Sequence, residues 1–439
     1  MTNRAPWTPR RLLARRVLRL VIVALPALAC SGGTDAPWPQ WRGPGGAGVF
    51  DQGSLPSTWD GGLGANVRWK TPVPGAGNSS PVVANDQVYL TASYPVNAAN
   101  PEGDHHRVVL AYDLTSGALL WQREVFAAAQ EKRHRLNTLA GPTPATDGHS
   151  VYAYFGSTLA RLDADGEIVW SQVIDPAYHD FTRYGAASSA VLDGDLVLVA
   201  QDKERAQTDD VGWLAAFDSG SGEQRWRTEW TETCCSYSTP VIVQRGAGRE
   251  ALFAHSGAIA GYDVATGERL WLYEYPMLQM VSTPVLGSDL VGILGGADNR
   301  RGNLMLRLTG TGRETQVQQL WHHERLAPQV SSPVLYRGLL YSLTLLGVLV
   351  ARDPESGDIV WEHRLAHGRN HASLMAGDGK VFATSTKGTV SVVTAGAEFE
   401  LLGENELGEM GTGASPAAGG GCLLLRGEQH LFCIEAAAP

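Results

Sequence analysis

The sequence lacks the common short catalytic signatures and has no long apolar run. It contains no Gly-x-x-x-x-Gly-Lys-Ser/Thr phosphate loop, no Gly-x-Ser-x-Gly nucleophile motif and no His-Glu-x-x-His zinc motif. Its apolar run from Leu20 to Ala29 is too short to cross a bilayer as a helix. The 51 glycines follow no Gly-x-y period, which excludes a collagen triple helix, and the 44% hydrophobic content argues against disorder.

Basic side chains are scarce beyond the first residues of the chain. Residues 1–29 contain six arginines and no acidic residue, so the remainder carries 29 basic and 45 acidic residues, a net charge of −16. Binding to nucleic acid phosphates requires a basic surface. The composition therefore predicts no nucleic-acid partner.

Residues 1–29 have the pattern of a secretory signal, with arginines followed by a ten-residue apolar run. We expect export to the periplasm, where disulfides can form. The sequence Ala27-Leu28-Ala29 suits ordinary signal cleavage. It also resembles a bacterial lipobox, with Ala27 at the usual leucine position, in which Cys30 is lipidated and becomes the first mature residue. In that case the protein is an outer-membrane lipoprotein, and the anchor is its one expected membrane contact.

A short phrase of the type Ser/Thr-Pro-Val occurs repeatedly along the chain. Four clear copies lie at residues 79–82, 238–241, 282–285 and 331–334. Weaker copies bring the total to eight and lie at residues 142–145, 187–190, 371–374 and 414–417. Each copy is followed by a polar turn and a short apolar run, which is the pattern of a β-hairpin.

A second phrase closes each unit, with Asp four residues before Gly and Trp four residues after it. The full copies are Asp113, Gly117 and Trp121; Asp218, Gly222 and Trp226; Asp263, Gly267 and Trp271; Asp353, Gly357 and Trp361. A shortened copy has Asp163, Gly166 and Trp170. We expect the carboxylate to accept backbone N–H groups of a turn and the glycine to supply its positive φ. The tryptophan would lie on the returning strand and pack between neighbouring sheets.

Two hairpins per unit give the four strands of a propeller blade. Eight units of about 47 residues fill residues 66–439. The last unit lacks its tryptophan strand, whereas residues 66–73, with Trp69, supply one at the other end. We therefore predict an all-β, single eight-bladed propeller of four-stranded antiparallel blades. Residues 66–73 would pair with residues 429–435 and close the ring.

Three further features complete this organisation. An open β-solenoid is the alternative architecture, and residues 30–65 form an N-terminal extension in either case. The fifth unit lacks its Asp and the seventh ends at Phe399, which we interpret as drift. Insertions at residues 93–107, 127–140 and 202–211 are expected to form loops at the rims.

The second phrase resembles the tryptophan-docking motif of the PQQ (pyrroloquinoline quinone) β-propeller family, and the resemblance covers residues 38–439. Residues 38–44 (Trp-Pro-Gln-Trp-Arg-Gly-Pro) resemble the opening of its exported bacterial members, and residues 396–408 their closing blades. This family contains quinoprotein dehydrogenases that oxidise alcohols with PQQ and Ca²⁺. It also contains the lipoprotein of the outer-membrane-protein assembly machine, which binds partners without a cofactor. The fold alone does not decide between these activities.

Cys234 and Cys235 are adjacent and lie just before the inner strand of the fourth blade. The resemblance implies that such a pair forms a vicinal disulfide ring stacked on the quinone. The alternatives are a structural or redox-labile ring, or separately paired or free thiols. Ser236 and Tyr237 follow the pair, where the alcohol dehydrogenases usually have Asp and then Asn-Arg. Neither a Glu, Asn and Asp set for Ca²⁺ nor a catalytic Asp base can be identified.

The four cysteines after Cys30 allow three disulfide pairings. Cys422 and Cys433 flank a predicted hairpin, so a cross-strand disulfide in the closing blade is the simplest interpretation. A metal site there would need more ligands nearby.

Two groups of histidines are close enough in sequence to be candidate metal ligands, but neither pattern favours that role. His363, His367 and His371 are spaced four apart, but Gly368 argues against a helix and we expect solvent-facing loop residues. The doublets at residues 105–106 and 322–323 would point in opposite directions on a strand.

The sequence favours a non-catalytic, monomeric propeller of the bacterial envelope that presents its axial loops to a protein or polymer partner. The principal alternative is a quinoprotein oxidoreductase that uses PQQ and Ca²⁺ to oxidise an alcohol or a sugar. A carbohydrate- or small-ligand-binding propeller is a third interpretation, because an axial funnel suits such ligands.

Overall fold

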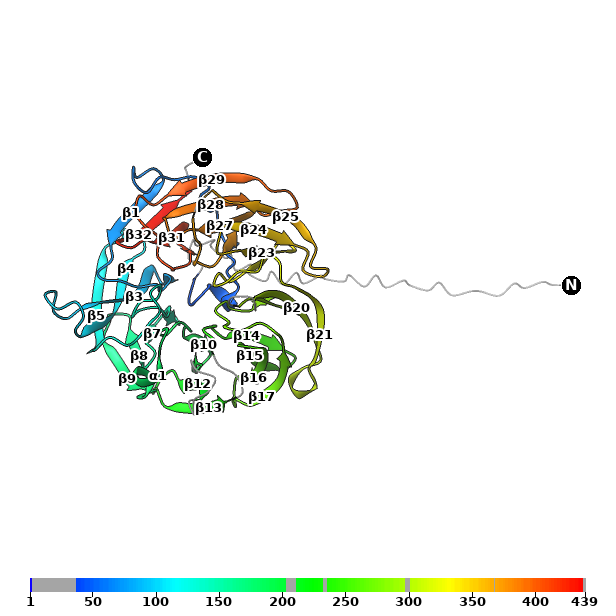
Figure 1. Cartoon of the computed structure of the whole chain (residues 1–439), viewed down its shortest axis with the longest axis horizontal. Coiled ribbons are helices and arrows are strands. Elements are labelled where there is room, and N and C mark those ends of the chain that lie inside the picture. The colour runs from blue at the N-terminus through cyan, green and yellow to red at the C-terminus, as the bar shows by residue number, and fades with distance from the viewer. Residues whose placement is uncertain (2–36, 203–210, 232–234, 297–300, 367, 437–439) are drawn as a thin grey trace. The chain divides into compact units, whose positions relative to one another are not determined.

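The computed structural model describes Met1 and residues 37–202, 211–231, 235–296, 301–366 and 368–436. The predicted signal at residues 1–29, Cys30 and Cys234 therefore lie outside the described residues, as does most of the insertion at 202–211. The chain divides into Met1–Gly33 and Thr34–Pro439. The strands of the second unit form eight four-stranded sheets arranged around a ring (Figure 1). Among the described helices, none has the length and apolarity to span a membrane.

Seven blades are each built from four consecutive strands. The strands of blades 1 to 4 are β2 (Val82–Ala84), β3 (Gln87–Pro95), β4 (His105–Asp113), β5 (Leu119–Ala128); β6 (Ala145–Thr146), β7 (Ser150–Tyr154), β8 (Thr158–Asp163), β9 (Ile168–Val173); β10 (Val191–Asp193), β11 (Leu196–Gln201), β12 (Gly212–Asp218), β13 (Gln224–Trp230); β14 (Val241–Arg245), β15 (Gly248–His255), β16 (Ala258–Asp263), β17 (Arg269–Glu274). The strands of blades 5 to 7 are β18 (Val285–Leu286), β19 (Leu290–Gly295), β20 (Gly302–Thr309), β21 (Gln316–His323); β22 (Val334–Tyr336), β23 (Leu339–Leu343), β24 (Val348–Arg352), β25 (Ile359–Arg364); β26 (Met375–Gly377), β27 (Lys380–Thr384), β28 (Thr389–Thr394), β29 (Leu401–Glu406).

The eighth blade is composite and confirms the predicted closure of the ring. It contains β30 (Ala417–Gly419), β31 (Cys422–Arg426), β32 (His430–Glu435) and, at its outer edge, β1 (Val67–Pro72). The β1 strand pairs antiparallel with β32, and Trp69 lies opposite Cys433. In Figure 1 the blue first strand accordingly lies beside the red last strands.

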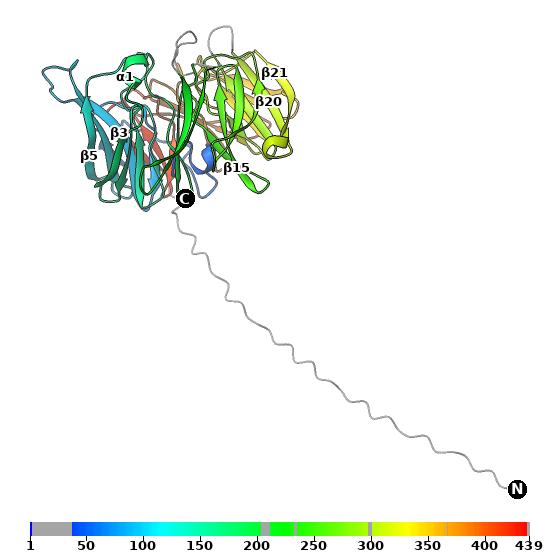
Figure 2. The same ribbon diagram turned by 90° about the horizontal axis from the view of Figure 1, so that it is seen from below.

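Helical structure among the described residues is limited to three short segments. These are α1 (Tyr178–Phe181) and two 3₁₀ turns, η1 (Pro44–Gly46) and η2 (Gly312–Glu314). The predicted rim insertion at residues 93–107 is shorter than expected. Because β3 and β4 stay in register up to the pair Pro95 and His105, only residues 96–104 form a loop. Figure 2 shows the propeller unit from below.

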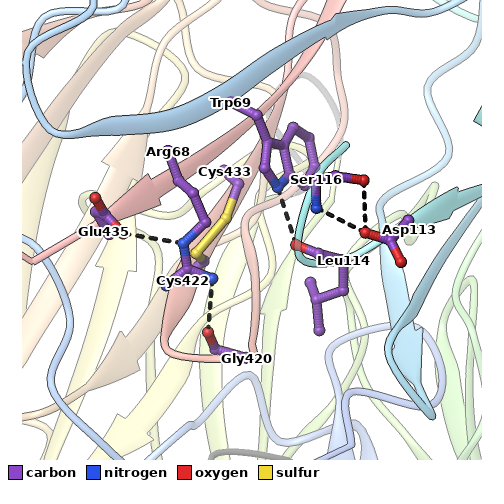
Figure 3. Close-up of a disulfide and its surroundings, with 9 residues drawn as sticks. All are labelled: Arg68, Trp69, Asp113, Leu114, Ser116, Gly420, Cys422, Cys433 and Glu435. Carbon is purple, nitrogen blue, oxygen red and sulfur yellow. Dashed lines mark hydrogen bonds and ion pairs between the residues drawn. A yellow bond between two sulfur atoms is a disulfide. The ribbon is translucent and has the colours of Figure 1, made fainter. Parts of the chain in front are cut away.

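The predicted disulfide between Cys422 and Cys433 is present, and it joins β31 to β32 (Figure 3). Next to it, Arg68 Nε lies 2.9 Å from Glu435 Oε2, and Arg68 Nη1 donates to the Gly420 carbonyl (3.0 Å). The two contacts of Arg68 therefore link the chain ends, and the disulfide fixes the C-terminal hairpin with which β1 pairs.

The repeated tryptophan joins one blade to the next at six interfaces. Trp69 Nε1 donates to the Leu114 carbonyl at 2.9 Å (Figure 3). The Trp69 ring also covers Gly117, where a Cβ atom would lie 2.6 Å from the indole. The same bond to the next blade forms from Trp121 to Ala164, Trp170 to Ser219, Trp226 to Val264, Trp321 to Pro354 and Trp361 to Gly396. The glycine thus serves two purposes, because it supplies the positive φ of the turn and makes room for the neighbouring indole.

The aspartate of the phrase has the predicted role in the turn. Asp113 Oδ1 accepts the backbone N–H of Ser116 at 2.7 Å, and the equivalent carboxylates accept in the same way. Hydrogen bonds from the Ser116 hydroxyl and from its backbone N–H hold the pKa of Asp113 below its usual value. The turn therefore presents its glycine to the preceding blade in a fixed geometry.

The fifth unit is not simple drift, contrary to our interpretation of its sequence. It lacks the turn carboxylate, and Trp271 Nε1 donates instead to Glu250 Oε2 of its own blade (2.8 Å). The other oxygen of Glu250 accepts the Gly312 backbone N–H of the next blade at 3.1 Å. Arg245 completes the link by contacting Glu250 and donating to the Gly310 carbonyl (2.7 Å). A buried carboxylate from blade 4 thus replaces the missing one of blade 5.

Alanine at Gly117 tests the contact between blades. Gly338 is a matched control, since both glycines have a positive φ (73° and 78°) but a Cβ at Gly338 meets no atom within 4 Å. Gly338→Ala should show only the backbone cost of about 1–2 kcal/mol. Gly117→Ala should destabilise the protein by about 1–3 kcal/mol more, because the Trp69 ring must move. Equal losses in denaturant unfolding would contradict the docking role of Trp69.

Candidate functional site

A belt of hydroxyl side chains surrounds the propeller axis. It consists of the last Ser or Thr before each inner strand, namely Ser80, Thr143, Ser189, Thr239, Thr283, Ser332, Ser373 and Ser415. In seven cases the backbone N–H donates to the hydroxyl of another blade's belt residue. The bonds run from Ser80 to Thr143 (2.9 Å), Thr143 to Ser189 (3.0 Å), Ser189 to Thr239 (3.0 Å), Thr283 to Ser332 (2.9 Å), Ser332 to Ser373 (2.9 Å), Ser373 to Ser415 (2.8 Å) and Ser415 to Ser80 (2.8 Å).

The hydroxyl belt explains the first repeated phrase, whose function was not apparent from sequence. The N–H groups at the start of the inner strands lie near the axis, where they need partners other than their own sheet. A hydroxyl can accept one such N–H group and still donate its own proton. The remaining position differs, because the Thr283 hydroxyl accepts from the Trp41 indole at 2.9 Å.

Trp41 belongs to an axial segment, residues 38–50, that crosses the central channel. Its Trp38 exchanges two backbone hydrogen bonds with Val83 of blade 1. The segment also contacts each of blades 2 to 7. The Pro39 carbonyl accepts from Thr146 of blade 2, Gln40 accepts from Leu192 of blade 3, and Gly46 lies beside Val241 of blade 4. Trp41 donates to Thr283 of blade 5, Arg42 donates to the Pro333 carbonyl of blade 6, and Phe50 donates to the Ala376 carbonyl of blade 7. The segment therefore closes the channel on one side of the hydroxyl belt.

Buried hydrogen bonds of Arg42 hold this segment against blades 6 and 7. Its guanidinium is fully buried and donates to the Leu374 carbonyl (3.2 Å), to the Pro333 carbonyl and to carbonyls of its own turn. Burial lowers the pKa of Arg42 to about 9, so the group stays charged at neutral pH. A buried charge requires several hydrogen bonds to offset its desolvation, which these carbonyls supply.

Above the segment lies a pocket of about 510 Å³. Trp41 and belt residues such as Thr283 and Ser332 line its base. The connections that lead from one blade to the next form its wall. These wall residues are Asn78, His134, Arg135, Leu136, Asn137, Gly141, Tyr184, Ala187, Tyr237, Gln279, Val281, Gly296, Gln329, Val330, Leu345, Arg369, His371 and Gly413.

Hydrogen bonds tie the wall connections to one another. Asn137 Nδ2 donates to the carbonyls of Tyr184 (2.9 Å) and Ala186 (3.0 Å), and Asn78 Nδ2 donates to the Leu136 carbonyl at 2.8 Å. Residues 134–137 of the insertion predicted at residues 127–140 line the axial pocket.

Aromatic rings form one side of the wall. The ring of Tyr184 lies 6.0 Å from that of His134 and 5.8 Å from that of Tyr237, measured between centroids. These three residues come from the connections to blades 2, 3 and 4. The His134 and Tyr237 rings are inclined by 45° and 84° to the Tyr184 ring, so the three rings form an angled, amphipathic surface.

The charged residues of the wall are all basic. Arg135, Arg369, His134 and His371 line the pocket, and no carboxylate stands among its described lining residues. Burial is the largest influence on His371, and together with the charges of Arg369 and His134 it lowers the pKa of His371 below 6.5. The pocket therefore favours an anionic ligand.

The prediction of solvent-facing loop residues holds in part: His363 is exposed but lies on a strand, whereas His371 lies in a connection but is half-buried. His371 is half-buried in the pocket, because its connection turns towards the axis before β26. His363 lies on β25 and stacks on Phe399, with ring centroids 3.8 Å apart. His367 lies outside the described residues. The doublets at residues 105–106 and 322–323 are on β4 and β21, as expected.

The predicted cofactor pair is only half described. Cys235 is half-buried with φ +67°, and the next residue, Ser236, donates its backbone N–H to Asp202 Oδ2 at 3.0 Å. Tyr237, two residues on, lines the pocket. The ring formed by Cys234 and Cys235, and its contact with a quinone, stay predictions.

The described lining does not fit a Ca²⁺–PQQ site. Calcium requires six to eight oxygen ligands that include carboxylates, whereas the charged side chains that line this pocket are basic. Nor do three or more His, Cys, Asp or Glu residues gather in a metal-binding arrangement elsewhere in the described chain. The residues in place are suited to binding an anion through hydrogen bonds.

Comparisons with known proteins agree with this fold. The family model described as the outer membrane protein assembly factor BamB matches residues 59–174, 104–297 and 307–425. No curated protein matches the sequence. Among solved structures, BamB from Moraxella catarrhalis is 14% identical with a TM-score of 0.56, and the match covers 84% of this chain and 99% of that one.

Two similar structures are enzymes. The quinohemoprotein alcohol dehydrogenase ADHIIG from Pseudomonas putida HK5 is 12% identical with a TM-score of 0.60, over 92% of this chain and 82% of that one. A europium-containing methanol dehydrogenase is 12% identical with a TM-score of 0.59, over 91% and 89%. At these identities the likeness concerns the fold.

The basic wall makes a testable prediction about His371. Because the neutral imidazole is favoured in the fold, its NMR titration midpoint should lie below 6.5, and its contribution to stability should be lost as the pH falls below that value. Arg369→Gln should raise the midpoint towards 6.5. Arg313→Gln is the control, since Arg313 is exposed and pairs with Glu268 away from the pocket. A midpoint above 6.5 in the unmodified protein would contradict the described environment.

Proposed function

Because the chain belongs to the PQQ-like β-propeller family of the outer membrane protein assembly factor BamB, we propose that it is a non-catalytic binding protein of the bacterial cell envelope. In this proposal residues 1–29 direct export and Cys30 carries a lipid anchor at the outer membrane. The propeller, residues 66–439, then presents its axial loops to a protein or polymer partner.

The composition of the axial pocket is the observation that carries this proposal. Arg135, Arg369, His134 and His371 line it without a described carboxylate. An alcohol oxidation needs a base for the hydroxyl proton and, in quinoproteins, oxygen ligands for the metal. Binding of a partner needs neither.

The hydrogen bonds that hold the pocket in place also favour a binding function. The wall connections are joined by hydrogen bonds, and the base is closed by the axial segment and the hydroxyl belt. A preorganised surface loses little conformational entropy when a ligand binds. We therefore expect the pocket and its rim to bind without a large rearrangement.

The quinoprotein alternative has a direct test. Purified protein would be titrated with PQQ in the presence of Ca²⁺ and in the presence of EDTA, and assayed for dye reduction with a panel of alcohols and sugars. We expect no calcium-dependent binding and no turnover. A matched titration with a PQQ-dependent alcohol dehydrogenase verifies the reagents. Calcium-dependent, saturable PQQ binding with turnover would overturn the proposal. It would favour the alternative in which Cys234 and Cys235 form a disulfide ring against the cofactor.

A further inference from the structure

We infer that the axial pocket binds a small acidic sugar of the uronic acid class through its carboxylate, without a metal ion. This inference rests on the proposed binding function and specifies the chemistry of the ligand. It is carried by the unused hydrogen-bonding groups of the pocket, by its charge and by its closed base.

Two guanidinium groups of the pocket have no partner among the described residues. Arg135 and Arg369 line the pocket, and within the described part of the chain neither side chain makes a hydrogen bond or an ion pair. Many other arginines of the propeller are paired with carboxylates, as Arg68, Arg307 and Arg325 are. A guanidinium presents a planar array of donors that matches a carboxylate in a bidentate manner. These two guanidinium groups therefore favour an anion whose oxygen atoms lie in one plane, such as a carboxylate.

Two side-chain amides of the pocket are equally available. Gln279 and Gln329 line it, and their amide groups form no hydrogen bond with any described residue. Gln279 has a positive φ of 56°, and its backbone N–H is fixed by Ser256 Oγ at 3.0 Å. An amide both donates and accepts, as the hydroxyl groups of a sugar do.

The base of the pocket is rich in hydrogen-bond donors. The Ser189, Ser332 and Ser373 hydroxyls already accept a backbone N–H, so each retains a proton that it can donate. The ligand should accordingly be rich in acceptors. A uronic acid offers a carboxylate and several other oxygen atoms, and the Gln279 and Gln329 amide oxygens can accept the protons of its hydroxyl groups.

The shape of the pocket limits the ligand to a small molecule or to the end of a chain. Its volume of about 510 Å³ lies within the usual range of small-molecule sites, and Trp41 and the hydroxyl belt close its base. One ring of the aromatic side formed by His134, Tyr184 and Tyr237 can contact the apolar face of a sugar ring. A sugar ring would therefore meet an aromatic face, basic groups and amides within one cavity.

Calorimetric titration of the full-length protein in EDTA with digalacturonate and with the neutral disaccharide lactose tests this inference. We expect digalacturonate to bind at least tenfold more tightly than lactose, with a change in tryptophan fluorescence from Trp41. Arg135→Gln and Arg369→Gln should each weaken digalacturonate binding by about tenfold, because each removes a charge-assisted hydrogen bond. Arg313→Gln, outside the pocket, should leave the affinity unchanged.

Several results would overturn the inference. These are equal affinity for lactose, a requirement for Ca²⁺, tighter binding of a glutamate-rich peptide with the same arginine dependence, or no binding of digalacturonate. Unfolding curves of the two variants establish that they are folded, which we expect since both arginines are exposed. If digalacturonate does not bind and no PQQ turnover occurs, only the inference of an acidic sugar ligand is rejected. Calcium-dependent PQQ turnover rejects the proposed function itself.

Discussion

The hydroxyl belt is the interaction on which the rest of the propeller depends. Eight inner strands begin close to one axis, and their first N–H groups cannot all be satisfied within their own sheets. A hydroxyl side chain of the belt solves this problem by accepting from a neighbouring blade in seven of the eight cases. The tryptophans join one blade to the next nearer the perimeter at six interfaces, and Glu250 does so between blades 4 and 5. The disulfide between Cys422 and Cys433 reinforces the blade in which the two chain ends meet.

The axial segment closes one side of the central channel, so that the ring encloses a pocket. Without residues 38–50, the belt would surround an open channel. Arg42 and Trp41 anchor the segment to the inner strands of blades 5, 6 and 7, so that it becomes the base of a pocket. The loops above then determine what the pocket binds, and their basic side chains give it the opposite sign to the acidic body of the protein.

Much of the fold could be predicted because its signals are local and repeated. The spacing of Asp, Gly and Trp predicts the turn and the indole, and the missing strand of the last unit predicts the ring closure. The site could not be predicted in this way. Arg135 and Arg369 are far apart in sequence, and only the ring brings their connections to one cavity. The replacement of a lost turn carboxylate by Glu250 likewise depends on contacts between blades.

Hydrogen exchange of the axial segment tests the central claim most directly. Peptides that cover residues 38–50 should exchange as slowly as those from a buried strand such as β23, because Trp38, Gly48 and Phe50 donate backbone N–H groups to buried carbonyls. The loop at residues 96–104 provides the fast reference within the same sample. Exchange of residues 38–50 at the rate of that loop would show that the channel is open and would contradict the account.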